Sequence, residues 1–222
     1  MQTVAFASVN WKLCLFAAVV ALVSYLLGSV SFAVIVSRIG AKDDVRNHGS
    51  GNAGMTNILR SYGKKMAAFT AIGDFGKGVI AVALGRIIFS LAGIQGIDAG
   101  YIAGLFVILG HLYPLFFGFK GGKGVLTSLG AAVIVSPIPF LVIAGIAIPT
   151  VFAVKIVSLI SVIGFALYPF VVVAVDLLLD KPLWGELLFS LIVSSLGIWK
   201  HRGNIQRLRA GTEYKFGQNN KD

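Results

Sequence analysis

Long apolar segments fill most of this chain and limit what it can fold into. Seven are apparent, at about residues 13–37, 66–92, 99–117, 124–136, 138–154, 156–179 and 183–199. A helix needs roughly 20 such residues to cross a bilayer. With 57% hydrophobic and 13% charged residues, the composition also favours a membrane protein. The sequence therefore predicts an all-α membrane protein with about seven transmembrane helices, one or more short or broken, in a single domain over residues 1–222.

The fourth apolar segment, 124–136, is too short for a straight crossing and is followed by Pro137 and Pro139. We expect a half-length helix that begins just after a glycine-rich turn. The positive end of its dipole would then point at any anion that the turn binds. Membranes tolerate a broken helix where its backbone is buried or lines a polar cavity. The alternative is a kinked hairpin over 124–154 that never crosses, which leaves five spans.

Basic residues are concentrated in a few loops, which predicts the orientation of the chain. Of 19 Lys and Arg, 15 lie in residues 38–65 and 117–124, at Lys155 and in the tail from residue 200. The positive-inside rule places these segments in the cytoplasm. An odd number of crossings then puts the N-terminus outside and the C-terminus inside. This distribution explains the net charge of +10 without nucleic acid as a partner.

The glycine-rich turn lies in FGFKGGKGVLTSLG, at Phe117–Gly130. Its glycines leave peptide N–H groups unscreened, so the turn can cup an anion, while Lys120 and Lys123 add positive charge. Neither the P-loop spacing nor the dinucleotide-binding fingerprint is present. The pattern predicts a phosphate site at a membrane surface; the alternative is an interfacial turn whose lysines contact lipid headgroups.

The first polar loop reads HGSGNAGMTNILR from His48 to Arg60. Ser50, Asn52 and Asn57 are hydrogen-bonding side chains, and Arg60 offers a planar fork for a phosphate. Capping of the following helix would need about two such residues. The loop is more polar than capping requires, so it is a second candidate for ligand binding.

Ionisable residues elsewhere are candidates for the same site. His48, His111 and His201 lie in three polar regions that the predicted topology brings to one side, although each alone is also explained as facing headgroups. Asp74 and Lys77, inside the second apolar segment, share one helical face where they neutralise each other. Such residues usually face the bundle interior and mark a site; the alternative is a pair that only ties helices together.

Three segments in order resemble the signature regions of the bacterial acyl-phosphate:glycerol-3-phosphate acyltransferases: GSGNAGMTNILR at 49–60, GHLYPLFFGFKGGKGVLTSLG at 110–130 and KHRGNIQRL at 200–208. The resemblance covers nearly the whole chain. It implies a multi-pass enzyme of the bacterial cytoplasmic membrane with its active site on the cytoplasmic side. The implied reaction moves a fatty acyl group from acyl phosphate to the 1-hydroxyl of glycerol 3-phosphate, giving lysophosphatidic acid and phosphate. Two small departures, Ala53 and Leu126, leave the polar residues intact.

The resemblance also implies roles for single residues. Those expected to carry the chemistry around glycerol 3-phosphate are Ser50, Arg60, Lys123 (with Lys120 as its alternative) and His201. Further substrate-binding candidates are Asn52, Asn57, Lys120, Gly121, Gly122, Gly124, Thr127 and Asn204, of which the residues 121–124 and Thr127 would hold the acyl phosphate and the first two asparagines would brace their loop. Supporting roles are expected for Asp74, Lys77, His111 and Glu213.

The implied partners are acyl phosphate, glycerol 3-phosphate and the lipid bilayer; no pattern assigns an oligomeric partner. The single cysteine, Cys14, excludes an intrachain disulfide and a cysteine-built metal site, and neither a metal nor another cofactor is expected. None of the three histidines has an Asp five positions on, so no local His–Asp base is evident. Since acyl phosphate carries a good leaving group, positioning and oxyanion stabilisation can supply much of the acceleration.

The alternative function is a membrane transporter of a small organic phosphate, built from the same loops and broken helix. A transporter needs a path open to both faces. The polar loop residues gather on one side of this chain, which favours an enzyme.

Overall fold

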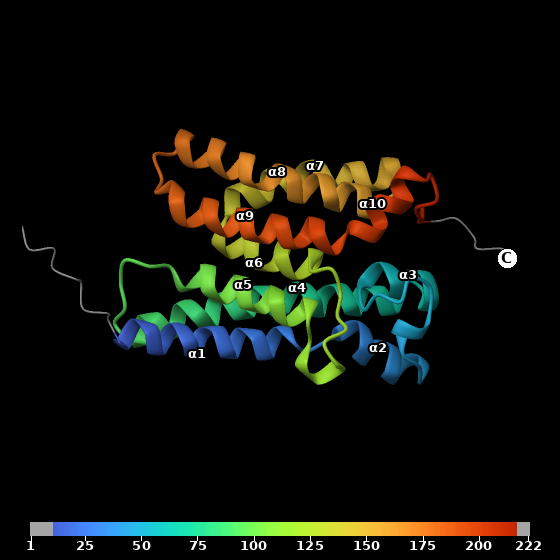
Figure 1. Ribbon diagram of the computed structural model, residues 1–222, viewed down its shortest axis with the longest axis horizontal. Helices are drawn as coiled ribbons and strands as arrows, with labels where there is room; N and C mark the ends of the chain where they lie inside the picture. Colours follow the sequence, from blue (N-terminus) through green and yellow to red (C-terminus); the bar gives the residue numbers. More distant parts are fainter. Residues whose placement is uncertain (1–10, 217–222) are drawn as a thin grey trace, which may run out of the picture.

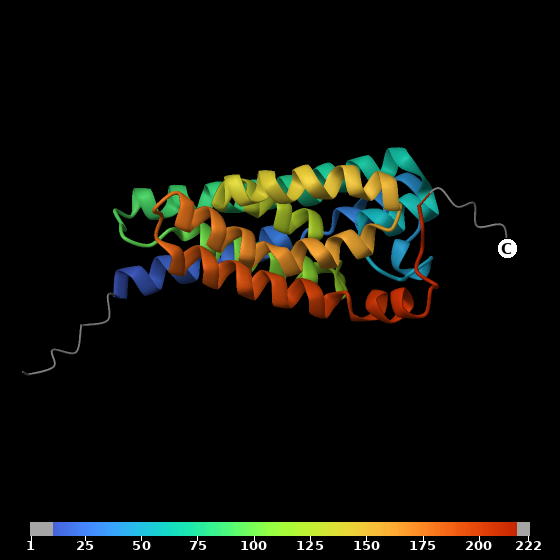
Figure 2. The same cartoon turned by 90° about the horizontal axis from the view of Figure 1, so that it is seen from above.

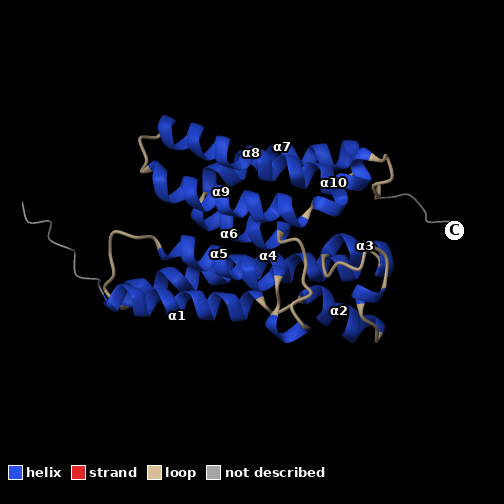
Figure 3. Cartoon of the chain, in the orientation of Figure 1, coloured by secondary structure: helices blue, strands red, loops and turns tan. Residues whose placement is uncertain are grey.

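The computed structural model describes residues 11–216, which form ten α-helices and contain no strand (Figure 3). The prediction of an all-α chain is confirmed. The helices are α1 Trp11–Gly28, α2 Phe32–Ala41, α3 Met55–Tyr62, α4 Lys64–Leu91, α5 Ala99–Leu112, α6 Val125–Val135, α7 Pro137–Val154, α8 Val157–Leu178, α9 Leu183–Lys200 and α10 Arg202–Arg209. Two short 3₁₀ helices, Val45–Asn47 and Leu115–Phe117, lie in the loops.

Six segments among the described residues are long and apolar enough to cross a membrane, namely Trp11–Ala41, Lys64–Leu91, Ala99–Phe117, Pro137–Val154, Val157–Leu178 and Leu183–Lys200. The seventh apolar helix, α6, is shorter. Its start directly after Gly124 and the position of Pro137 as the first residue of α7 match the predicted half-length helix. Proline is favoured at a helix start because the N–H that it lacks would have no partner within the helix there.

The short helix α6 lies at the centre of the molecule (Figures 1 and 2). It packs against α4 and α5 on one side and against α7 and α9 on the other. Two glycines permit the contact with α4: a Cβ on Gly78 would lie 2.4 Å from the Thr127 oxygen, and one on Gly130 would lie 2.0 Å from the Phe75 oxygen. Small residues let membrane helices approach this closely. The second layer, α7 to α9, is thereby held against the first through α6.

The first predicted span, 13–37, is interrupted, and its two helices, α1 and α2, together form the candidate span Trp11–Ala41. The chain leaves helical geometry between Gly28 and Phe32, where Ser31 is extended. A break inside a membrane span leaves backbone carbonyls without partners, and each one is costly there. The Lys77 ammonium of α4 compensates by donating a hydrogen bond to the Val30 oxygen at 2.8 Å.

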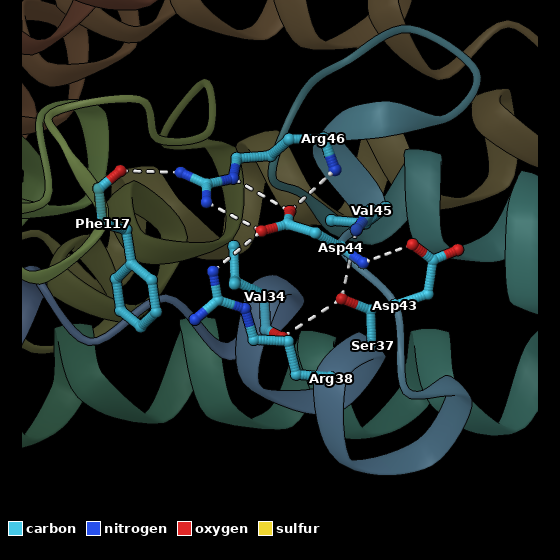
Figure 4. Close-up of polar contacts among 8 residues, drawn as sticks. All are labelled: Val34, Ser37, Arg38, Asp43, Asp44, Val45, Arg46 and Phe117. Atoms are coloured by element: carbon cyan, nitrogen blue, oxygen red, sulfur yellow. Dashed lines mark hydrogen bonds and ion pairs between the residues drawn. The ribbon is translucent and has the colours of Figure 1, made fainter.

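The loop after α2 is fastened to the turn after α5 by a contact that we call the Arg46 clasp, formed by Asp44, Arg46 and the Phe117 carbonyl (Figure 4). Arg46 binds the Asp44 carboxylate through two nitrogens and donates a third hydrogen bond to the Phe117 oxygen at 2.6 Å. The Arg46 guanidinium holds the pKa of Asp44 well below its usual value, so the carboxylate stays charged near neutral pH. The clasp joins the two polar segments predicted to bind phosphate.

The start of α1 and helix α10 lie at opposite ends of the bundle (Figures 1 and 2). The chain termini themselves, on which the predicted sidedness depends, fall in residues 1–10 and 217–222, outside the described residues.

Candidate active site

A cavity of about 430 Å³ opens where the three polar segments meet. One end is lined by side chains from the first loop, the glycine-rich turn and the C-terminal segment, which the sequence separates widely. The remainder is lined mainly by apolar residues of α6, α7 and α8. The predicted site residues that line it are Ser50, Asn52, Asn57, Arg60, Asp74, His111, Lys123, Gly124, His201, Asn204 and Glu213.

Lys123 is held at the polar end by a chain of hydrogen bonds. Its ammonium donates to Asn204 Oδ1, and Asn204 Nδ2 donates to Glu213 Oε1 at 2.8 Å. Arg207 Nε in turn donates to Glu213 Oε2 at 2.8 Å. Burial lowers the pKa of Lys123 to about 8, with neighbouring cations adding to the effect and Glu213 opposing it. The lysine therefore remains mostly charged at pH 7 but is poised to lose its proton.

Arg60 approaches the cavity from α3 and stacks on Tyr214. Its guanidinium carbon lies 3.9 Å from the centre of the Tyr214 ring. Its Nε is buried and has no hydrogen-bond partner among the described residues. A stacked guanidinium keeps its planar edge available for an anion, so this geometry suits a fixed, bidentate phosphate contact.

His201 is buried at the junction of α9 and α10, with 2% of its surface exposed. Its Nδ1 lies 2.7 Å from the Gly197 carbonyl oxygen, so the proton sits on Nδ1 and Nε2 is a hydrogen-bond acceptor. Burial lowers the pKa of His201 to about 4, which the Gly197 carbonyl opposes. The ring is therefore neutral at pH 7 and can accept a hydrogen bond from a substrate hydroxyl.

Asn57 shapes the first loop from inside. Its amide nitrogen donates to the carbonyl oxygens of Val45, His48 and Asn52, and its Oδ1 accepts the Ser50 N–H at 3.0 Å. These bonds occupy the side chain, which supports the bracing role that was expected of it. The hydrogen bond from the Ser50 N–H to Asn57 holds the Ser50 backbone at the cavity wall.

The glycine-rich turn packs tightly against the end of α5. The Gly122 N–H donates to the His111 oxygen at 3.1 Å, so it is not free for a phosphate as expected. A Cβ on Gly122 would lie 2.1 Å from His111 Nε2 and 2.7 Å from the Ala53 oxygen. Gly121 is equally constrained, because a Cβ there would lie 2.0 Å from the His111 oxygen. Of the three glycines only Gly124 lines the cavity, so the other two act through packing.

Three further predicted residues lie elsewhere. Lys120 is exposed and does not line the cavity, so of the two lysines of the turn only Lys123 does. Thr127 is fully buried on the α6 face that meets α4, whereas its neighbour Ser128 lines the cavity. His48 pairs with Asp43 on the surface, so the expected convergence of three histidines is wrong for this one. The local turn at 48–50, not the topology, decides where its side chain points.

Beneath the turn lies a buried group of charged residues. Asp74 Oδ1 is 2.8 Å from the Lys77 ammonium and 3.4 Å from His111 Nδ1, and all three side chains are at most 6% exposed. The predicted neutralisation of Asp74 by Lys77 is confirmed. The histidine–aspartate pair was not visible in the sequence because its members come from different helices, α4 and α5. His111 also borders Gly122, so this group supports the turn.

The model of the glycerol-3-phosphate acyltransferase family matches residues 18–211. The chain belongs to the glycerol-3-phosphate acyltransferase family.

Similar proteins match most of the length of this acyltransferase. The glycerol-3-phosphate acyltransferase of Clostridioides difficile strain 630 is 43% identical over 200 residues, which cover 90% of this chain and 95% of the relative. That of Neisseria meningitidis serogroup C strain 053442 is 42% identical, with 88% and 94% covered.

Two crystal structures of PlsY (YgiH), an integral membrane glycerol 3-phosphate acyltransferase, share the fold. The glycerol 3-phosphate form has a TM-score of 0.78 and 35% identity, covering 90% of this chain and 96% of that chain. The lysophosphatidic acid form has a TM-score of 0.75 and 34% identity, with 90% and 95% covered. With its apolar helices, the acyltransferase is a multi-pass membrane protein.

The polar residues that line the cavity of this acyltransferase and that sequence reasoning missed include Ser128, Ser158 and Tyr214. The hydroxyls of both serines are buried without hydrogen-bond partners among the described residues. A buried, unpaired hydroxyl beside a cavity is available to a ligand. Isolated serines in apolar segments carry no sequence signal for such a role.

Proposed function

We propose that this protein transfers a fatty acyl group from acyl phosphate to the 1-hydroxyl of glycerol 3-phosphate, the first acylation step of phospholipid synthesis. The products are lysophosphatidic acid and inorganic phosphate. One observation carries the proposal: a single cavity joins a polar, basic end to a long apolar limb between helices. Such a cavity fits a substrate pair in which both members carry phosphate and one also carries an acyl chain. The relatives named for glycerol 3-phosphate acylation support the same reaction.

Glycerol 3-phosphate is assigned to the polar end. Arg60 and Lys123 offset the charge of its phosphate, and charge-assisted hydrogen bonds of this kind are among the strongest in proteins. Asn204 is fixed between Lys123 and Glu213, so it holds the lysine toward the ligand. His201 Nε2 and the Ser50 hydroxyl are the groups available to orient the glycerol hydroxyls.

The phosphate of the donor is assigned to the start of α6. Gly124 and the first residues of this helix line the cavity, and the first N–H groups of a helix attract anions. Ser128, one turn further, adds a buried hydroxyl. The acyl chain then continues along α6, α7 and α8.

The reaction needs one step. The 1-hydroxyl oxygen attacks the carbonyl carbon of acyl phosphate, a carbon–oxygen bond forms, and the bond from that carbon to the phosphate oxygen breaks. The leaving phosphate takes the hydroxyl proton, so charge and atoms balance without an enzyme-bound acyl group. Ser50 makes no hydrogen bond to a histidine or carboxylate among the described residues, so it lacks the partner that activates a nucleophilic serine.

We further infer seven crossings by one domain of residues 1–222 in the bacterial cytoplasmic membrane, with the N-terminus outside and the C-terminus and active site inside. The basic loops support this orientation. Single cysteines at Arg209 and Gln95, in a Cys14→Ser background, test it with an impermeant thiol reagent on intact cells. We expect labelling at position 95 alone; labelling at position 209 would reverse the orientation.

Vesicles that contain only this protein distinguish the enzyme from the transporter. We expect lysophosphatidic acid to form when acyl phosphate and glycerol 3-phosphate are both present, with one phosphate released per product. A transporter would instead move labelled glycerol 3-phosphate across the vesicle membrane without forming product. A burst of phosphate without acceptor, with acyl label retained on denatured protein, would replace the one-step reaction by an acyl-enzyme.

A further inference from the structure

The apolar limb of the cavity stops at particular residues of the helices that line it. On α8 its lining reaches Tyr168, and the next residue on that face, Val172, is buried but lies outside the cavity. The deepest lining residues on α6, α7 and α9 are Ala132, Phe140 and Val193. Among these helices α8 packs against α7 and α9, and α6 packs against α7 and α9. On α8 the cavity therefore stops at Tyr168 and does not continue to Val172.

A hydrogen bond holds this closed end in place. The hydroxyls of Ser136 and Tyr168 are 2.9 Å apart, and both residues are buried, with 0% and 6% of their surfaces exposed. Ser136 is the residue between α6 and α7, so the bond ties that junction to α8. The Tyr168 ring is fixed by this bond instead of being free to swing aside.

The region beyond Tyr168 is polar. Asp176, near the end of α8, and Glu186, near the start of α9, are 1% and 6% exposed. Both oxygens of Asp176 and Oε1 of Glu186 lack hydrogen-bond partners among the described residues. An alkyl chain that extended past Tyr168 toward these groups would be unfavourable, because it cannot hydrogen-bond to buried carboxyl oxygens. Tyr168 therefore stops a chain sterically, and the acidic groups disfavour the region beyond it.

The depth of the limb can be compared with the length of an acyl chain. From Ser158 to Tyr168 the rise of α8 is about 15 Å, and from Phe152 to Phe140 the rise of α7 is about 18 Å. Carbon–carbon bonds of about 1.5 Å at tetrahedral angles advance an extended chain by about 1.25 Å per carbon. The limb thus holds about 12 to 14 carbons.

We infer that Tyr168, fixed by Ser136, sets the longest acyl chain that this enzyme uses well. The inference rests on the proposed function, and it assigns the substrate class as acyl phosphates whose chains fill but do not exceed the limb. Each methylene buried up to that point should strengthen binding about fourfold. Beyond about 14 carbons the gain should stop or reverse.

The test measures kcat/KM of the purified full-length protein with acyl phosphates of 10 to 18 carbons. Tyr168→Ala removes the ring and should move the break to chains longer by about two carbons or more. Gly164→Leu fills the limb one turn above Tyr168, and a Cβ there meets only Ile143 at 3.7 Å, an ordinary contact. It should move the break in the opposite direction, by about four or five carbons.

Two variants serve as controls. Tyr168→Phe keeps the ring, so the break should stay near its wild-type position. Leu167→Ala makes the neighbouring change on the outer face of α8, where 46% of Leu167 is exposed, and should also leave the break unmoved. Opposite shifts in Tyr168→Ala and Gly164→Leu support the inference.

Three results would overturn it. A wild-type profile without a break would show that chains bend out of the limb, and equal breaks in wild type and Gly164→Leu would show that the chain does not occupy it. In both cases product still forms, so the proposed function would stand. Absence of lysophosphatidic acid with every chain length would overturn the proposed function and this inference together.

Discussion

The pH dependence of the reaction should report the ionisation of Lys123. Burial lowers the pKa of this ammonium from 10.5 to about 8, so at pH 9 roughly one free enzyme molecule in ten retains the charge. A lysine loses its positive charge as pH rises, so phosphate binding weakens above pH 8 and not below it. Because kcat/KM follows the free enzyme, its value for glycerol 3-phosphate should fall above pH 8, approaching about tenfold per pH unit.

Bound substrate changes the position of this break. A phosphate beside Lys123 favours the charged lysine and raises its pKa in the complex. The pH profile of kcat, which reports the complex, should therefore break at a higher pH than that of kcat/KM. A difference of one unit corresponds to about 1.4 kcal/mol of interaction between the lysine and the phosphate.

The assay follows lysophosphatidic acid formation from pH 6.5 to 10, with enzyme-free blanks that correct for spontaneous hydrolysis of acyl phosphate. Phosphate groups of substrates ionise near pH 6, below this window. Lys123→Arg is the matched variant because arginine stays protonated throughout, so the break near pH 8 should vanish whatever the absolute rate. A flat wild-type profile from pH 7 to 9.5, or a break that persists in Lys123→Arg, would refute the reasoning.

Four other changes have defined outcomes. Gly122→Ala places a methyl group 2.1 Å from His111 Nε2 and should lower kcat about a hundredfold in protein that still inserts, measured on purified enzyme. Arg60→Lys loses the fork and the stacking on Tyr214, so KM for glycerol 3-phosphate should rise about tenfold to a hundredfold. Asp74→Asn leaves the Lys77 ammonium buried beside a neutral group and should cost about 3 kcal/mol or more of stability, seen as a lower Tm. His201→Gln should retain residual turnover, and any inflection of the rate near pH 6.5 should be the same in both enzymes, because the pKa of His201 is lowered to about 4.

Controls separate these effects from general damage. A Cβ on Gly76 meets nothing within 4 Å, so Gly76→Ala should keep wild-type turnover where Gly122→Ala does not. If Arg60→Lys alters only the KM for acyl phosphate, the two phosphate sites have been assigned the wrong way round. An unchanged Tm in Asp74→Asn would mean that Lys77 is neutral in the folded protein.

The membrane helices could be predicted because a bilayer imposes length and apolarity on each segment, and α6 could be recognised by its short length and by the prolines that follow it. The break between α1 and α2 could not, because its stabilising partner, Lys77, lies 47 residues away from Val30 in the sequence. The helix propensities of residues 28–32 do not depend on such a distant contact.

The site, too, was predictable only in part. Residues within the motifs were predicted to belong together, and Arg60, Lys123 and His201 do line one cavity. The motifs do not indicate which backbone and side-chain groups face the cavity. Gly122 donates its N–H to His111, and Thr127 faces α4, because backbone packing between neighbouring helices decides both.

The buried Asp74–Lys77 pair has a consequence for how such a sequence can change over time. Loss of Lys77 alone would strand a carboxylate and also the carbonyl of Val30, and loss of Asp74 alone would strand an ammonium. Either first step therefore passes through an unstable protein, whereas replacement of both by apolar residues removes the charges together and leaves only the Val30 carbonyl without its partner. The two positions should change together, and a lineage that has lost one should be found to have lost, or displaced, the other.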